Sequence, residues 1–132
     1  MSEASSNVES VRAYLAAAAR RDESAMRAAF TDDVRYVVHG RGRLAGEGRG
    51  VAAVFSAFAD LSRLSGGSYR IDEEVDWLTS EGRVLLVARE SAERDGTRLE
   101  WTRLVLFTMR DGLIGAVDVF DDDQARQAEF WA

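Results

Sequence analysis

The chain has 132 residues, 46% of them hydrophobic, and a formal net charge of −6. This length suits one domain with a core of its own. The negative charge argues against nucleic-acid binding, which needs Lys and Arg to neutralise phosphates. All 17 basic residues are arginines, so a Schiff-base lysine and a P-loop lysine are both excluded.

Cysteine is absent, and His39 is the only histidine. Disulfides, thiolate chemistry and a multi-histidine metal site within one chain are therefore excluded. No apolar run approaches the roughly 20 residues that span a bilayer, and the N-terminal MSEASSNVES lacks the apolar segment of a signal peptide. We expect a cytoplasmic protein without metal, cofactor or membrane contact, whose chemistry depends on carboxylates, tyrosines, arginines, tryptophans and one histidine.

The N-terminal half predicts three helices and one strand. A helix is expected over 6–20, where Ser6 and Glu9 match a capping box, and Asp22 can cap a second, short helix that reaches Phe30. Residues 34–38 are β-branched and aromatic, as in a strand. Apolar residues at helical spacing predict a third helix from Val51 onward, which Gly66 and Gly67 end.

Between this strand and the third helix lies YVVHGRGRLAGEGRG, residues 36–50. Its glycine spacing is one residue too long for a dinucleotide fingerprint, and no P-loop lysine exists. We interpret it as a turn-rich crossover at the rim of a cavity. There His39, Arg41 and Arg43 would select what enters, although a lone histidine at a strand end is more often a turn residue.

The C-terminal half changes to strand periodicity. Strands are predicted near 69–79, 83–93, 97–110 and 113–121, joined by the turns SEG, RDG and RDG, and DDDQARQAEFWA ends the chain as a short helix or an extension. The whole chain, 1–132, then forms a single α+β domain. Helices cover one face of a curved antiparallel sheet, and the resulting cone can hold a small ligand.

Glu73 is the candidate general acid or base that this alternation selects. It shares a predicted strand face with Tyr69, Ile71, Val75 and Trp77. A carboxyl group that faces an apolar interior has a raised pKa and can move protons. The alternative is a β-bulge that turns Glu73 outward.

The strand over 97–109 places Trp101 and Arg103 on one face with Val105, Phe107 and Met109. A buried Arg103 needs a carboxylate partner, which Glu73 or Asp121 could supply, in a catalytic or a purely structural ion pair.

Other side chains are expected at the ligand or at a partner. Both faces of the strand over 97–109 are largely apolar, which favours a homodimer through this part of the sheet. The neighbouring strand leaves either Arg89 or Glu90 inward. The candidates for contact with a ligand are Tyr36, His39, Phe55, Trp77, Arg89, Trp101 and Phe107.

The ordered set of motifs resembles the SnoaL-like branch of the nuclear transport factor 2-like superfamily. FTDDVRYVVHG resembles that family's entry into its first strand, GRGRLAGEGRGVAAVF its strand-to-helix segment, and RDGLI its final hairpin. The resemblance covers nearly the whole chain. It implies a cone-shaped fold shared by ketosteroid isomerases, polyketide cyclases, epoxide hydrolases, dehydratases and non-catalytic ligand-binding proteins, so the fold alone does not give the function.

The resemblance allows the family's catalytic positions to be tested in turn. The oxyanion-binding tyrosine of the isomerases matches Tyr14, which could equally be a core residue. Their catalytic acids fall on Val38 and near Val105. Isomerisation through those carboxylates is therefore not expected.

In the epoxide hydrolases, the Asp–Arg–Asp set matches Arg89, but the neighbouring acid falls on Ser91. The last-strand acid falls on Val119, or on Asp118 if the register slips by one residue. The acid of SnoaL-type cyclases lies near Asp121, although three consecutive aspartates also suit a helix cap.

Two functions follow from these residues. The first is a cofactor-independent enzyme, namely a cyclase, isomerase, dehydratase or epoxide hydrolase. It would act by acid–base chemistry on a polyketide- or terpenoid-like molecule, with Glu73, Tyr14, Arg103 and Asp121 as catalytic candidates. The second is a non-catalytic ligand-binding or dimeric interaction domain of the same fold. Two titratable groups that converge on one open cavity would favour the enzyme.

Overall fold

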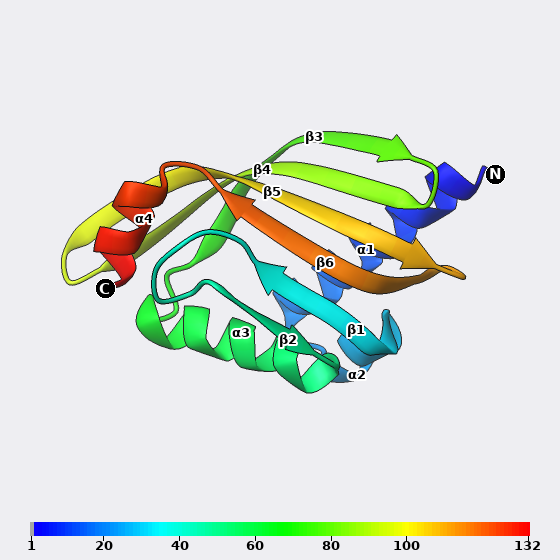
Figure 1. The fold of residues 1–132 in the computed structure, drawn as a ribbon, viewed down its shortest axis with the longest axis horizontal. Helices are drawn as coiled ribbons and strands as arrows, with labels where there is room; N and C mark the ends of the chain where they lie inside the picture. Colours follow the sequence, from blue (N-terminus) through cyan, green and yellow to red (C-terminus); the bar gives the residue numbers. More distant parts are fainter. Residues whose placement is uncertain (1) are drawn as a thin grey trace.

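The computed structural model describes residues 2–132, which form four helices and a six-stranded sheet (Figure 1). The elements in chain order are α1 Glu3–Arg20, α2 Glu23–Ala28, β1 Phe30–Val38, β2 Gly46–Arg49, α3 Val51–Leu64, β3 Arg70–Ser80, β4 Arg83–Arg94, β5 Thr97–Arg110, β6 Leu113–Asp121 and α4 Gln124–Trp131. The α+β class and the predicted order of long elements are confirmed. Among the described residues, no helix is long and apolar enough to cross a membrane.

The sheet has the strand order β2-β1-β6-β5-β4-β3. Strands β3 to β6 form an antiparallel meander, as predicted from their hairpin turns. Two features depart from the predicted antiparallel plan. Strand β1 runs parallel to β6, so the sheet is mixed, and the glycine-rich segment contains the short strand β2, which pairs with β1.

The helix caps test the local predictions. The capping-box prediction for Ser6 is wrong, because α1 begins earlier and the Ser2 side chain accepts a hydrogen bond from the Ser5 N–H. The prediction for Asp22 is confirmed, since its carboxylate accepts from the Ala25 N–H at 3.1 Å. Helix α2 ends at Ala28, and Phe30 already belongs to β1.

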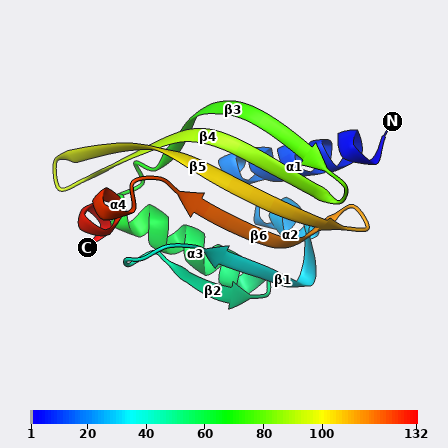
Figure 2. The same ribbon diagram turned by 45° about the horizontal axis from the view of Figure 1, so that its top comes forward.

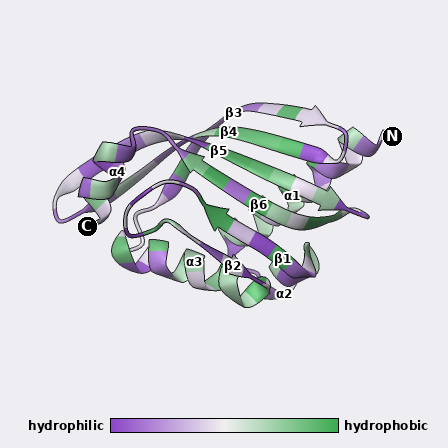
Figure 3. Ribbon diagram, viewed as in Figure 1, coloured by the Kyte–Doolittle hydropathy of each residue, from purple (hydrophilic) through white to green (hydrophobic). Residues whose placement is uncertain are grey.

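Helices α1, α2 and α3 lie together on one side of the sheet (Figures 1 and 2), here called the inner face. The main apolar core fills this face, with Tyr14 packed edge-on against Phe30 and Phe107. A second apolar cluster lies nearer α4 and includes Leu61, Leu99, Trp101 and Trp131. The colouring of Figure 3 agrees with this arrangement, since β4 and β5 are more hydrophobic than β3.

Strand β3 is an edge strand whose alternation is broken by irregularities between Ile71 and Glu73 and between Glu74 and Asp76. Ile71 pairs with Glu90, and Glu73 pairs with Arg89. Two steps along β3 therefore correspond to one step along β4. The extra residue moves Glu73 to the outer face, as a β-bulge does. The prediction that Glu73 faces the interior is therefore wrong, and its side chain is exposed.

Candidate functional site

Three charged side chains from three adjacent strands meet on the inner face near α4. Arg103 of β5 donates two hydrogen bonds to Asp121 of β6, from Nε to Oδ1 at 2.7 Å and from Nη2 to Oδ2 at 3.2 Å. Its Nε also lies 3.1 Å from Oε1 of Glu90 on β4. The exposed side-chain fractions are 9% for Arg103, 8% for Asp121 and 1% for Glu90. A buried guanidinium thus lies between two buried carboxylates, here called the Glu90–Arg103–Asp121 cluster.

The strand register brings these residues together. Arg103 pairs directly with Asp121, and Glu90 pairs with Trp101, two residues before Arg103 on the same face. Residues two apart on a strand point to the same side. The predicted inward direction of Arg103 is confirmed, as is its partner Asp121, whereas Glu90 takes the place predicted for Glu73.

Two aromatic side chains complete the hydrogen bonding of the cluster. The Tyr69 hydroxyl donates to Glu90 Oε1 at 2.8 Å, and the Trp101 indole N–H donates to Asp121 Oδ1 at 2.8 Å. The Arg103 guanidinium carbon lies 5.6 Å from the centre of the Tyr69 ring and 6.0 Å from that of Trp101. These contacts fit cation–π geometry and fix the orientation of all three charged groups.

Burial and the neighbouring charges shift the pKa values of Glu90 and Arg103 in opposite directions. Burial raises the pKa of Glu90, although Arg103 and the Tyr69 hydroxyl oppose that shift. Burial also raises the pKa of Tyr69 well above its usual range. For Arg103 burial disfavours the charge, but Glu90, Tyr69 and Asp121 outweigh it and keep the pKa above the usual arginine value. Arg103 is therefore a permanent cation, and Glu90 is a carboxyl group that takes up a proton more readily than usual.

A cavity of about 280 Å³ reaches the cluster through Arg103. Its lining residues are Tyr36, Val38, Arg43, Leu44, Ala45, Gly46, Glu47, Gly48, Ala53, Ser56, Ala57, Asp60, Leu61 and Arg103. The backbone of two glycines of β2 and the methyl groups of two alanines of α3 form much of one wall, and charged side chains occur along it. This volume is close to the lower end of the range for small-molecule sites, roughly 300 Å³.

Tyr36 lines this cavity, as predicted from its place on β1. Burial raises the pKa of the Tyr36 hydroxyl, and the charge of Arg103 partly opposes the shift. No hydrogen bond within residues 2–132 involves this hydroxyl, so it can donate to a ligand. The Tyr36 hydroxyl and the Arg103 guanidinium are therefore among the hydrogen-bond donors that line this cavity.

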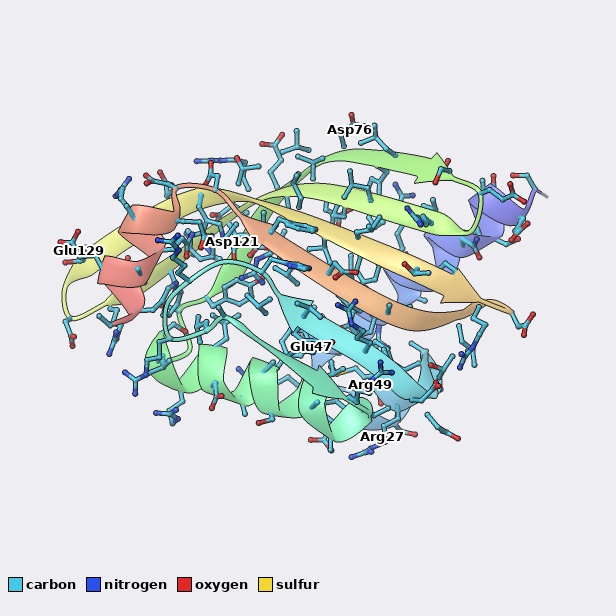
Figure 4. The ribbon with its side chains drawn as sticks, in the orientation of Figure 1. Arg27, Glu47, Arg49, Asp76, Asp121 and Glu129 are labelled. Carbon is cyan, nitrogen blue, oxygen red and sulfur yellow. The ribbon has the colours of Figure 1, made fainter. Side chains whose placement is uncertain are left out.

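A second, much smaller cavity of about 20 Å³ lies beside α4. Asp121 and His39 contribute to its lining, and Arg43, Leu44 and Ala45 line both cavities. Figure 4 labels Asp121 near the end of β6, where this strand approaches α4. Asp121 thus borders the small cavity, while its partner Arg103 borders the large one.

His39 lies at the rim of the small cavity, as the sequence predicted for this segment. Its Nε2 is 2.7 Å from Asp118 Oδ1, and its ring stacks on Phe120 at 4.3 Å. Arg35 also contacts Asp118, with Nη1 at 3.4 Å from Oδ1. Asp118 therefore belongs to a surface ion-pair network on the outer face and does not join the buried cluster.

The catalytic candidate Tyr14 and several predicted ligand contacts belong to the core instead. Tyr14, Trp101 and Phe107 are 4%, 1% and 1% exposed, and none of them lines either cavity. Phe55 packs against the main core beneath the Arg27 guanidinium, and Trp77 packs against it beneath Arg12. Because apolar spacing selects core residues and wall residues alike, it could not separate the two groups.

Arg89 was predicted at the ligand, but it lies on the outer face and donates to the Thr102 hydroxyl at 2.8 Å. Glu90 is the inward residue of this pair, and the sequence pattern left the choice between Arg89 and Glu90 open. Both faces of VLLVARE, residues 84–90, are apolar, so alternation gave no decision. The sequence feature that could have indicated Glu90 was the need of a buried Arg103 for carboxylate partners. Among the described residues, no group of three or more His, Cys, Asp or Glu side chains is placed to hold a metal ion.

The fold and the site together define a helix-covered sheet with a cavity beside buried charges. Residues 11–117 match the family model of the SnoaL-like domain. The chain therefore belongs to the SnoaL-like family, as the motifs of the sequence had indicated. The nuclear transport factor 2-like fold is shown by the same comparison and by the solved structures that the chain resembles.

Three similar proteins illustrate the extent of this likeness. Protein Rv0034 of Mycobacterium tuberculosis (strain ATCC 25618 / H37Rv) is 32% identical over 126 residues, which cover 96% of each chain. The solved structure of Bal32a, from a soil-derived mobile gene cassette, has 29% identity, a TM-score of 0.91 and coverage of 99% and 100%. A putative SnoaL-like polyketide cyclase from Jannaschia sp. CCS1 has a TM-score of 0.83, 18% identity and coverage of 100% and 96%, which shows the fold alone.

Proposed function

We propose that the protein is a cofactor-independent small-molecule enzyme that works by acid–base chemistry in the large cavity. The main support for this proposal is the position of Arg103, which is held by two buried carboxylates and still lines a cavity of about 280 Å³. A structural ion pair alone has no need of a cavity beside it. The reaction classes that suit this site are cyclisation, isomerisation, dehydration and epoxide hydrolysis, and the substrate is polyketide- or terpenoid-like.

Arg103 and Tyr36 line the large cavity, whereas Glu90 and Asp121 contact Arg103 without lining it. Arg103 and the Tyr36 hydroxyl donate hydrogen bonds to an oxygen of the substrate and stabilise the negative charge that develops on it. Glu90 and Asp121 hold Arg103 in place and are the candidate proton acceptors. Tyr36 takes the role that the resemblance suggested for Tyr14. The cluster also has the carboxylate–arginine–carboxylate composition expected of an epoxide hydrolase, with its arginine on β5 instead of β4.

Two simple probes test this proposal without knowledge of the natural substrate. Exchange of the α-protons of α-tetralone in deuterated buffer, followed by proton NMR, reports proton abstraction. Formation of the diol from styrene oxide, followed by chromatography, reports hydrolysis. We expect the wild-type protein to accelerate at least one of them, Tyr36→Phe to lose roughly 10²-fold or more of that rate, and Glu73→Gln to keep it. Equal rates for wild-type protein, Tyr36→Phe and buffer would reject the catalytic proposal.

The alternative function is ligand binding without catalysis. It is favoured by the incomplete access of the carboxylates, since neither Glu90 nor Asp121 lines the large cavity. If α-tetralone binds at Arg103, seen as a shift of its side-chain N–H signal, and no proton exchange follows, this alternative is supported.

We also propose that the chain forms a homodimer through the outer face of the sheet around β5. Apolar side chains from four strands lie in register there, at Leu78, Leu85, Val87, Leu104, Leu106 and Phe120. Leu78, Leu104 and Phe120 are 47%, 36% and 41% exposed. An exposed apolar patch of this kind marks an interaction surface, and a second copy of the chain offers the same patch.

The dimer is tested by sedimentation velocity. We expect the wild-type chain to sediment as a dimer and Leu104→Glu as a folded monomer, because a carboxylate in an apolar interface costs several kcal/mol. Val75→Glu is the matched control, since Val75 is 49% exposed on the edge strand β3. A wild-type monomer at all concentrations would reject the dimer.

A further inference from the structure

The first residue of α4, Gln124, joins two segments that are far apart in the sequence. Its Oε1 accepts a hydrogen bond from the Arg41 backbone N–H at 3.0 Å, and its Nε2 donates to the backbone oxygen of Asp121 at 2.7 Å. One side chain thus ties the loop between β1 and β2, residues 39–45, to the end of β6. Figure 1 shows this loop reaching towards α4.

Two glycines allow the β1–β2 loop to lie directly against α4. Gly40 has φ +113°, and a Cβ at this position would overlap the Gln124 side-chain amide. Gly42 has φ +105°, and a Cβ there would come within 3.2 Å of the Ala128 Cα. Both conformations favour glycine. Close contact with α4 therefore explains the glycines at positions 40 and 42.

The same loop forms part of the wall of the proposed ligand site. Arg43, Leu44 and Ala45 line the large cavity and the small one, so they separate the two. Arg43 is exposed and Leu44 packs against the second apolar cluster. The position of the loop therefore sets the boundary of the large cavity on the side nearest α4.

We propose that Gln124 is a positioning residue that holds this wall in place and limits access to the large cavity. Its other hydrogen bond goes to the backbone of Asp121, whose carboxylate holds Arg103. One residue thereby connects the cavity wall with the charged cluster. This inference rests on the large cavity being the ligand site of the proposed function.

The test measures access to the cavity without any ligand. Because the chain has no cysteine, Ala57→Cys places a single thiol in the cavity wall on α3. Its rate of reaction with Ellman's reagent is compared in three backgrounds, namely the natural Gln124, Gln124→Met and Gln124→Glu. The methionine removes both hydrogen bonds, whereas the glutamate keeps an acceptor for the Arg41 N–H. Glu129→Cys, an exposed site on α4, gives the reference rate in each background.

We expect Gln124→Met to raise the Ala57→Cys rate, relative to the reference, by about threefold to tenfold, as local opening becomes easier. Gln124→Glu should stay within about twofold of the natural background because the loop remains held. An unchanged rate in Gln124→Met would overturn the proposal, and so would an equal rise in both variants. Far-UV circular dichroism confirms that each variant is folded. Since no ligand is used, failure here leaves the acid–base proposal standing, and failure of that proposal leaves this test valid.

Discussion

The two ends of the inner face of the sheet bury different kinds of side chain. Away from α4, the helices and the sheet enclose an apolar core in which Phe107 and Tyr14 are almost wholly buried. Near α4, the same strands bury Glu90, Arg103 and Asp121. The cavity of about 280 Å³ lies beside the charged end, where Arg103 lines it.

This difference indicates where stability and function are separated in the chain. Apolar burial stabilises a fold in proportion to the area removed from water. A buried ion pair contributes much less, because the loss of hydration offsets most of the attraction between the charges. The proposed ligand site gives the charged end a role that its small contribution to stability does not.

The largest expected effect on stability lies at the apolar end. Phe107→Ala should lower the free energy of unfolding by about 3–5 kcal/mol, through lost burial and the resulting cavity. Urea unfolding measures this change. The folded fraction should keep the activity of the wild-type protein towards the two probes. A large loss of activity per folded molecule would show that the two ends are not separate.

Arg103→Met tests the charged end. It should lower the free energy of unfolding about as much as Phe107→Ala does, but by an amount that depends on pH. Removal of one partner leaves buried carboxylates unpaired, which costs about 3–5 kcal/mol at neutral pH. The cost should shrink in acid as Glu90, whose pKa is raised by burial, takes up a proton. Urea unfolding from acidic to neutral pH measures both effects, and a cost that is constant with pH would contradict the charged state assigned to the cluster.

Tyr69→Phe removes the hydroxyl that donates to Glu90 Oε1 at 2.8 Å. Hydrogen bonds to charged groups contribute roughly 1.5–3 kcal/mol to stability, so the free energy of unfolding of the variant should be lower by that amount. Thermal unfolding provides the measurement. A change below about 0.5 kcal/mol, typical of surface positions, would mean that this bond does not orient Glu90.

The smallest effect is a change in how stability depends on pH. Because burial raises the pKa of Glu90 above its ordinary value of 4.5, the folded chain binds this proton more tightly than the unfolded chain. Its stabilising contribution is therefore complete below about pH 4.5 and is lost as pH rises through the folded pKa. The stability of wild-type protein minus that of Glu90→Gln should decline over this window. Glu73→Gln, at an exposed position, is the control, and a difference that rises with pH would contradict the shift.

The sequence predicted β5 better than β3, and the reason is physical. On β5, Trp101, Arg103 and Phe107 follow strict alternation because two neighbouring strands hold the register. On β3, an edge strand with only one neighbour, irregularities in the register turned Glu73 outward, although the letters alternate equally well. The position of a bulge depends on the pairing partner, which local periodicity does not contain.

The charged cluster was predictable in part. The need of an inward Arg103 for a carboxylate led to Asp121, which the structure confirms. Alternation did not single out Glu90, because both faces of β4 are apolar in sequence. The short strand β2 was missed because glycine and charged residues have low strand propensity, and pairing with β1 overrides that tendency.

The central claim is that Arg103 and Tyr36 receive an oxygen of the ligand in the large cavity. A crystal structure of the protein soaked with α-tetralone tests it most directly. We expect the ketone in the cavity, with its carbonyl oxygen within hydrogen-bond distance of the Arg103 guanidinium or the Tyr36 hydroxyl. A ketone bound only on the outer face of the sheet, or a cavity without ligand density at saturating concentration, would contradict it.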